Sequence, residues 1–227
     1  MKLVASIFCL MISCVAFAQH QALSQLVYEI RDPSTDSAHF RQALEKIGEY
    51  LALEVLDELE TTEESITTLM QADAKHQIVQ ETPVLVTILR AGLPLNNGVQ
   101  KIFQNSEVGF LAMSRNEKTL KADVDYIALP DLKDRCVIIV DTMLATGGSL
   151  LDAVRIVEQG CPKKIFVIAA IASEYGLERV CEYNPHIKVF SAAVDPVLNE
   201  RGYIVPGLGD AGDRSFGMKH LVSMPTS

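Results

Sequence analysis

The residues best suited to chemistry follow a short apolar run in the middle of the chain. Residues 137–140 read Val-Ile-Ile-Val, Asp141 comes directly after them, and the loop that follows contains Gly147 and Gly148. A carboxylate at the end of a buried strand can accept hydrogen bonds from vicinal sugar hydroxyls or lie near a divalent cation. The loop then opens a helix, whose free N–H groups and dipole favour a phosphate. This segment therefore predicts a site for a phosphorylated sugar.

The side chains of the loop fit the same interpretation. Gly147 and Gly148 let the backbone approach a phosphate closely, and Thr146 and Ser149 add hydroxyl donors. No Gly-Lys-Ser/Thr sequence follows, so the loop is not a Walker A motif. Taken alone, the segment also fits a plain strand-to-helix turn in which Thr146 or Ser149 caps the helix.

Two segments elsewhere carry an arginine that suits phosphate oxygens. Residues 88–95 read Ile-Leu-Arg-Ala-Gly-Leu-Pro-Leu and place Arg90 at the end of a predicted strand. Residues 114–120 read Ser-Arg-Asn-Glu-Lys-Thr-Leu and contain Arg115. A guanidinium group can bind phosphate oxygens through two parallel hydrogen bonds. Each segment alone fits a solvated turn or surface loop equally well.

A glycine-rich segment, residues 199–217, lies near the C-terminal end of the sequence. It contains the spacing G-x-G-x-x-G at Gly207, Gly209 and Gly212. A dinucleotide-binding interpretation fails, because that fingerprint belongs to the first strand-to-helix turn and requires an acid about twenty residues later. Residues 213–217 are also a poor start for the helix that the fingerprint needs. The segment is predicted to be irregular.

In their order and spacing, these four segments resemble the type I phosphoribosyltransferases, and among them the uracil-specific family. Residues 143–149, Met-Leu-Ala-Thr-Gly-Gly-Ser, carry the closest likeness. Most of the wider superfamily has a second acid where the uracil family and this chain have alanine, at Ala145. The uracil family usually has proline where this chain has Thr142. The resemblance covers residues 22–220.

The resemblance implies an enzyme that transfers the phosphoribosyl group of phosphoribosyl pyrophosphate (PRPP) to N1 of uracil, giving UMP and diphosphate. It implies that Arg115, Asp141 and Asp210 act in catalysis. The residues implied to contact PRPP are Arg90, Arg115, Asp141, Thr142, Met143, Leu144, Ala145, Thr146, Gly147, Gly148, Ser149 and Asp210. Those implied to contact uracil are Ile204, Gly209, Asp210 and Ala211.

The resemblance also implies Mg²⁺ as a cofactor, bound mainly through PRPP, with Asp141 or Asp210 nearby. The five histidines are scattered without metal-ligand spacing, so no metal site made by a protein cluster is predicted. Homo-oligomers and, in some members, activation by GTP are further implications. Two alternatives stay open: a non-catalytic PRPP- or nucleotide-sensing protein on the same fold, and a phosphoribosyltransferase for another base. The glycine-rich segment, which the resemblance implies to be a hood over the base, favours uracil.

Apolar periodicity predicts the elements that must position these residues. Continuous apolar runs predict buried strands at residues 84–89, 108–113, 137–140, 165–172 and 188–194. Helical spacing predicts helices at residues 23–31, 39–60, 95–103, 150–158 and 174–182. Their alternation predicts an α/β fold with a central, mostly parallel β-sheet flanked by helices, the type I phosphoribosyltransferase fold. We expect a β-hairpin arm within residues 61–82 and a long loop at residues 116–129.

Composition limits the partners. The 227 residues carry a formal net charge of −9 without a run of Lys or Arg, which excludes binding to nucleic acid through its phosphates. Five cysteines occur without a C-x-x-C pair, which fits a reducing compartment.

The N-terminal residues, in contrast to the cysteines, suggest export from the reducing compartment. Residues 1–18 have the shape of a secretory signal, with Lys2, an apolar run and Ala-Phe-Ala before Gln19. An apolar N-terminal helix or an upstream extension of the enzyme is the alternative. We expect residues 22–220 to form a single domain and the protein to be cytoplasmic, or secreted or periplasmic if the signal is cleaved. No membrane partner is expected.

Overall fold

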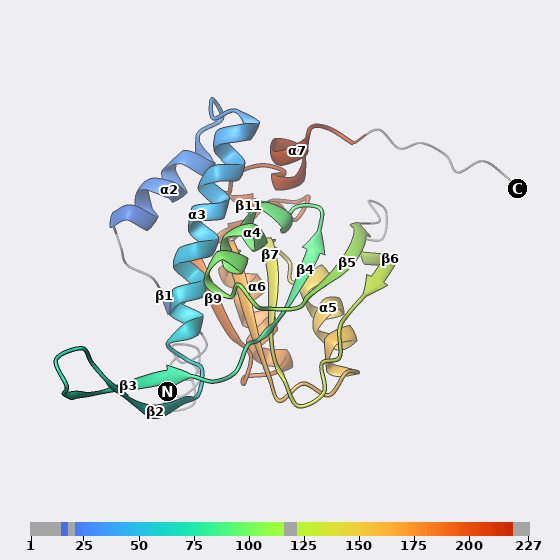
Figure 1. Cartoon of the computed structure of the whole chain (residues 1–227). Helices are drawn as coiled ribbons and strands as arrows, with labels where there is room; N and C mark the ends of the chain where they lie inside the picture. Colours follow the sequence, from blue (N-terminus) through green and yellow to red (C-terminus); the bar gives the residue numbers. More distant parts are fainter. Residues whose placement is uncertain (1–14, 18–20, 116–121, 220–227) are drawn as a thin grey trace, which may run out of the picture.

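The computed structural model describes residues 15–17, 21–115 and 122–219. In this part of the chain the centre is a seven-stranded sheet. In spatial order its strands are β1 (Val15–Phe17), β9 (Lys188–Asp195), β8 (Lys164–Ser173), β7 (Cys136–Leu144), β4 (Val84–Leu89), β5 (Val108–Arg115) and β6 (Ala122–Ala128). Every neighbouring pair is parallel except β5 and β6. The predicted α/β fold with a mostly parallel sheet is confirmed (Figure 1).

Helices cover both faces of the sheet, which is why its central strands are apolar throughout (Figure 1). The helices α2 (Gln21–Arg31), α3 (Ser37–Leu56), α4 (Leu93–Ile102) and the short α7 (Ala211–Phe216) share one apolar core with Ile138 and Val140. The helices α5 (Gly148–Glu158) and α6 (Glu174–Tyr183) share the second core with Val137 and Ile139. Alternate residues of β7 therefore point into opposite cores.

The long helix α3 begins where the sequence provides a cap. Asp36 is its N-cap, and the carboxylate accepts hydrogen bonds from the backbone N–H groups of Ala38 and His39. One stripe of α3 is fully buried, including Phe40, Leu44, Ile47 and Leu51. This stripe fixes α3 across the sheet beside α4, the helix that follows the loop carrying Arg90.

Two glycines bring α3 and α4 into unusually close contact. A Cβ atom on Gly98 of α4 would lie 1.8 Å from the carbonyl oxygen of Glu45, and one on Gly48 of α3 would lie 2.1 Å from that of Leu95. We expect Gly98→Ala to lower the free energy of unfolding by about 2 kcal/mol, because the two backbones must separate. Urea denaturation measures the change. Asn97→Ala, at the exposed neighbouring position, should leave stability unchanged or slightly raised, and equal effects of the two variants would contradict the close packing.

The predicted arm is confirmed as an antiparallel hairpin of β2 (Thr61–Thr67) and β3 (Asp73–Val79), which projects from the body of the molecule (Figure 1). The predicted loop at residues 116–129 is wrong in its second half, because β6 occupies Ala122–Ala128 and pairs with β5; residues 116–121 lie outside the described part. The sequence pattern did not indicate this strand because it contains polar residues. Such residues are tolerated here, since β6 is an edge strand with an exposed face.

Two other expectations need correction. The loop expected between the strand at residues 137–140 and the helix at residues 150–158 is shorter, because β7 continues to Leu144 and α5 begins at Gly148. The glycine-rich segment, expected to be irregular, contains the short strand β11 (Ile204–Val205) and the helix α7, and β11 pairs with β10 (Val197–Leu198), which precedes the segment. Asp210 supplies the cap that α7 needs, so the helix starts before the residues considered unfavourable.

The N-terminal segment is described only at Val15–Phe17, where it forms β1, parallel to Val189–Ser191 of β9. The alternative of an apolar helix is therefore wrong for these three residues, and residues 1–14 and 18–20 lie outside the described part. Across the described ranges, we find no helix with both the length and the apolar character needed to span a bilayer.

Candidate active site

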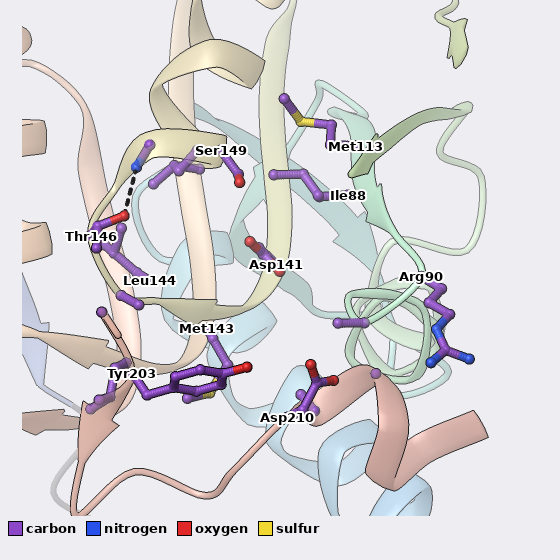
Figure 2. A pocket seen from close by; sticks show the side chains of 18 of the residues that line it. Ile88, Arg90, Met113, Asp141, Met143, Leu144, Thr146, Ser149, Tyr203 and Asp210 are labelled. Atoms are coloured by element: carbon purple, nitrogen blue, oxygen red, sulfur yellow. Dashed lines mark hydrogen bonds between the residues drawn. The ribbon is translucent and has the colours of Figure 1, made fainter. Parts of the chain in front are cut away.

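A cavity of about 680 Å³ opens where β4, β5 and β7 end at the carboxyl edge of the sheet. In a parallel α/β sheet, this edge is where ligands bind. The cavity collects three segments distant in sequence: the loop after β4, the loop after β7 and the glycine-rich hood (residues 199–217). Figure 2 shows Asp141 near its centre, with Ser149 and Thr146 on one side and Arg90 and Asp210 on the other.

Most of the predicted site residues lie together in this cavity. Those that line it are Arg90, Asp141, Met143, Leu144, Ala145, Thr146, Gly147, Gly148, Ser149, Ile204, Gly209, Asp210 and Ala211. Thr142 is not among them, and Arg115 ends β5 with a side chain outside the described part.

The carboxyl group of Asp141 is a weaker acid here than an ordinary aspartate. Burial raises its pKa to about 6, although hydrogen bonds from the backbone N–H groups of Thr142 and Met143 act in the opposite direction. The Thr142 N–H lies 2.7 Å from Oδ1. A carboxylate held this way gains strongly from a nearby cation or from hydroxyl donors, which restore the solvation that burial removed.

The phosphate loop, residues 145–149, connects β7 to α5. Gly147 is the N-cap of α5 and has φ of +76°, a left-handed conformation that favours glycine. From Gly148 onward the first turn of α5 presents backbone N–H groups that lack intrahelical partners, with the positive end of the helix dipole behind them. Residues from Ala145 to Leu150 all line the cavity. The arrangement suits an anion such as a phosphate.

Thr142 contributes through a contact that its spacing in the sequence did not indicate. The side chain is fully buried, and its hydroxyl donates a hydrogen bond to the carbonyl oxygen of Ala91 at 2.6 Å. This bond ties the end of β7 to the loop after β4. Thr142 therefore links two walls of the cavity. Because Thr142 does not line the cavity, the structure does not support the predicted contact between its side chain and PRPP.

Arg90 crosses from the loop after β4 to the hood. Its Nη2 donates to the carboxylate of Asp213 at 2.6 Å and to the carbonyl oxygen of Gly217 at 2.8 Å. The peptide bond between Leu89 and Arg90 is cis. The side chain is one-third exposed, which leaves it accessible to an anion in the cavity.

The hood is held over the cavity by an ion pair whose carboxylate is buried. Arg31 of α2 donates through both terminal nitrogens to Asp195, at 2.7 and 2.9 Å, and to the carbonyl oxygen of Gly207 at 2.9 Å. The N–H of Gly207 donates to the same carboxylate at 2.9 Å. Further on, Asp210 caps α7 by accepting from the N–H of Asp213 at 2.8 Å. These bonds place Ile204 and Gly209–Ala211 along one wall.

Sequence reasoning missed several residues that line the cavity. Ile88 and Met113 come from β4 and β5, Tyr203 from the hood, and Met218 and Lys219 from the segment after α7. Tyr203 and Ile88 lie inside segments that the sequence singled out, so proximity to the motifs was a usable signal. Met218 and Lys219 carry no pattern, and only the path of the chain brings them to the cavity.

Within the described residues, no group of three or more His, Cys, Asp or Glu side chains is arranged to hold a metal ion. Two carboxylates nevertheless line the cavity on separate walls, Asp141 and Asp210. Carboxylate oxygens are the ligands that Mg²⁺ prefers, and Mg²⁺ commonly takes one or two of them together with phosphate oxygens of a ligand. The donor set therefore fits a cation that arrives with a phosphorylated substrate.

The fold and the cavity define a class of protein. It is a parallel α/β protein with a ligand cavity at the carboxyl edge of its sheet, a glycine-containing loop at a helix N-terminus on one side and a C-terminal hood on the other.

Comparison with known proteins narrows this class. The sequence model of the uracil phosphoribosyltransferase family matches residues 17–218. The uracil phosphoribosyltransferase of Clostridium kluyveri is 41% identical over 191 residues, which cover 84% of this chain and 91% of that protein. The one from Thermococcus gammatolerans is 36% identical over 207 residues, covering 89% and 92%. The solved structure of the AQ2163 protein from Aquifex aeolicus superposes with a TM-score of 0.83 at 36% identity, covering 89% of this chain and 98% of that one. The chain belongs to the uracil phosphoribosyltransferase family.

Proposed function

We propose that this chain is a uracil phosphoribosyltransferase, an enzyme that transfers the phosphoribosyl group of PRPP to N1 of uracil. One observation supports this above the others. A phosphate-type loop, a carboxylate at a strand end and the glycine-rich hood surround a single cavity, although they come from separate parts of the sequence. Because fold alone does not specify chemistry, it is this combination that supports transfer between a phosphosugar and a base.

PRPP has three parts, and the cavity offers a partner for each. The 5-phosphate fits the phosphate loop, where the N-terminus of α5 supplies N–H donors. The ribose hydroxyls fit the carboxylate of Asp141, which lies between that loop and Arg90 (Figure 2). In this orientation the diphosphate would lie near Arg90, and Arg115 at the end of β5 would be a second cation close to it. Asp210 lies on the hood side of the same space.

Uracil would lie against the hood. The base presents alternating carbonyl and N–H groups along one edge, and a backbone segment offers both acceptors and donors. Ile204 and Gly209–Ala211 line the cavity in a segment whose direction is set by the ion pair of Arg31 with Asp195. A specific fit to this edge would exclude purines, which are larger and present a different pattern of donors and acceptors.

The reaction needs no protein nucleophile. N1 of uracil forms a bond to C1′ of the ribose as the bond from C1′ to the diphosphate oxygen breaks, and the diphosphate leaves with the electron pair. The proton of N1 is released. The protein holds the two substrates in line and places positive charge beside the leaving group through Arg90 and Arg115. Asp141 and Asp210 would hold Mg²⁺ together with the substrate phosphates, and the ion would supply charge neutralisation at the diphosphate.

We further propose that residues 22–220 act as one catalytic domain, with residues 1–18 as an extension, and that the enzyme works in the cytoplasm as a homo-oligomer. PRPP is made inside cells, which supports that compartment. Activation by GTP is proposed from the family resemblance alone.

The full-length protein should form UMP when mixed with PRPP, Mg²⁺ and uracil, and should form no nucleotide with hypoxanthine, adenine or orotate. Chromatography of the products measures this. If PRPP binds in calorimetry but no base reacts, the chain is a sensor and the enzymatic proposal fails. If PRPP does not bind, the assignment of the phosphate loop itself is wrong.

A further inference from the structure

Helix α6 lies directly behind the phosphate loop, on the side away from the cavity. The hydroxyl of Ser173, at the end of β8, donates to the carbonyl oxygen of Ala145 at 2.6 Å. Arg179, one turn into α6, donates through Nη1 to the carbonyl oxygen of Thr146 at 2.5 Å. Two consecutive carbonyl groups of the loop are therefore bound from behind by side chains that do not line the cavity.

The approach of α6 is close and leaves little freedom. A Cβ atom on Gly176 would lie 2.5 Å from the carbonyl oxygen of Ala145, so only glycine allows this contact. Ser173 also caps α6, because its oxygen accepts the N–H of Gly176 at 2.8 Å. The guanidinium group of Arg179 lies 5.9 Å from the centre of the Tyr175 ring, a distance at which a cation is attracted to an aromatic face.

These bonds determine where the loop N–H groups point. The peptide group is planar and trans at these positions, so its N–H points opposite to its carbonyl group. The carbonyl of Ala145 shares a peptide plane with the N–H of Thr146, and the carbonyl of Thr146 shares one with the N–H of Gly147. Because both carbonyls are turned towards α6, both N–H groups are turned towards the cavity that Thr146 and Gly147 line.

The peptide between Thr146 and Gly147 depends most on a hydrogen-bond partner for its orientation. It precedes Gly147, which has φ of +76° and, without a side chain, can also adopt other backbone conformations at little cost. Without a partner for the Thr146 carbonyl, this peptide can rotate and turn its oxygen into the cavity. An oxygen there would repel a phosphate, whereas the N–H attracts it.

We propose that Arg179, supported by Tyr175, is a positioning residue that holds the phosphate loop in its anion-binding form, with Ser173 in the same role for the preceding peptide. The inference rests on the proposed function, since it takes the 5-phosphate of PRPP as the ligand of this loop. Arg179 itself touches no substrate. It acts through the orientation of two backbone N–H groups.

The test uses Arg179→Met in the full-length chain, which keeps an unbranched side chain and removes the guanidinium group. Calorimetry with ribose 5-phosphate, which carries only the 5-phosphate, should show binding weakened roughly tenfold, the order expected for losing one charge-assisted hydrogen bond. Binding of Mg²⁺-diphosphate, expected beside Arg90, should stay within about twofold. In turnover, KM for PRPP should rise with kcat nearly unchanged, the pattern expected when binding is lost equally in the ground state and the transition state.

A matched control is present in the chain. Arg155 of α5 also lies over a tyrosine ring, Tyr183 at 5.2 Å, and pairs with Asp152, but it does not contact the phosphate loop. Arg155→Met should leave the binding of both ligands unchanged. Arg179→Lys, which keeps one charged donor, should recover part of the lost affinity for ribose 5-phosphate.

Three results would overturn the inference. Unchanged affinity of Arg179→Met for ribose 5-phosphate, equal weakening of ribose 5-phosphate and diphosphate, or an equal effect of Arg155→Met would each show that Arg179 does not position this loop. Thermal unfolding of each variant shows whether the fold is intact. A wild-type protein that binds neither ribose 5-phosphate nor PRPP would overturn the proposed function together with the inference, so the two failures are distinguishable.

Discussion

Asp141→Asn should reduce UMP formation by about 100-fold or more and, at neutral pH, make the ligand-free protein more stable than the wild type. The loss of activity follows from the place of Asp141 between the phosphate loop and Arg90 (Figure 2). Asparagine has a similar shape and can still accept the 2.7 Å hydrogen bond from the Thr142 N–H. It carries no charge, so it binds ribose hydroxyls and a substrate-bound cation much more weakly.

The gain in stability follows from the raised pKa of Asp141. Burial raises that pKa from 3.8 to about 6 in the folded protein. Between these two pH values the folded state keeps a proton that the unfolded state has released, so the contribution of this group to stability falls as pH rises. The penalty is complete above about pH 6 and absent below about pH 4. Asparagine removes it.

The size of the effect is limited because the side chain lines a cavity and is only half-buried. One pKa unit corresponds to about 1.4 kcal/mol, and with solvent screening we expect a gain of about 1 to 2 kcal/mol at pH 7.5. Urea denaturation at pH 7.5 and pH 4 measures the difference, which should shrink towards zero at the lower pH. Asp125→Asn, at an exposed position of β6, is the control and should change neither activity nor the pH dependence.

A gain that persists at pH 4 would show that shape, and not charge, sets the stability of this site. Normal turnover by Asp141→Asn would remove Asp141 from the proposed mechanism. The expected combination, lower activity with higher stability, is the usual mark of a residue kept for function at a cost to the fold.

Arg31→Met should destabilise the protein by about 3 kcal/mol and weaken uracil binding far more than PRPP binding. The reason is the environment of Asp195, whose side chain is 6% exposed and which receives both terminal nitrogens of Arg31. Removing Arg31 leaves Asp195 as a buried, uncompensated charge, which costs more than the pair itself contributes. The same substitution frees the Gly207 carbonyl, so the hood loses its anchor to α2.

The double variant Arg31→Met/Asp195→Asn separates the two effects. It removes the unpaired charge and should recover much of the stability, while the hood stays released and the KM for uracil stays high. Lys101→Met, which breaks a surface contact with Glu45 and Glu49, is the control and should change stability little, because exposed ion pairs are screened by solvent. If Arg31→Met lowered PRPP and uracil affinity equally, the hood would not be a separate base-binding wall.

Local patterns were enough for the central elements. The runs of Val, Ile and Leu that end in Asp141 or Arg90 are buried strands that end at the cavity, because a parallel sheet covered on both faces needs apolar residues throughout. The patterns failed at β6, where an edge strand tolerates polar residues, and at α7, whose cap Asp210 also lines the cavity. At β6 the pairing with β5 outweighs the local propensity, whereas the cap of α7 is a local signal that the glycine-rich pattern obscured.

The sequence by itself determined the α/β fold class, the strand–loop–helix unit around Gly147 and the family resemblance, because these depend on the order and spacing of nearby residues. Only the tertiary structure decided which remote groups meet. Arg31 and Asp195 stand 164 positions apart, and Arg179 reaches the Thr146 carbonyl from another helix. Such pairs leave no periodic trace in a single sequence, since they exist only once the elements have packed together. They set the direction of the hood and of the loop N–H groups, and so the geometry of the cavity.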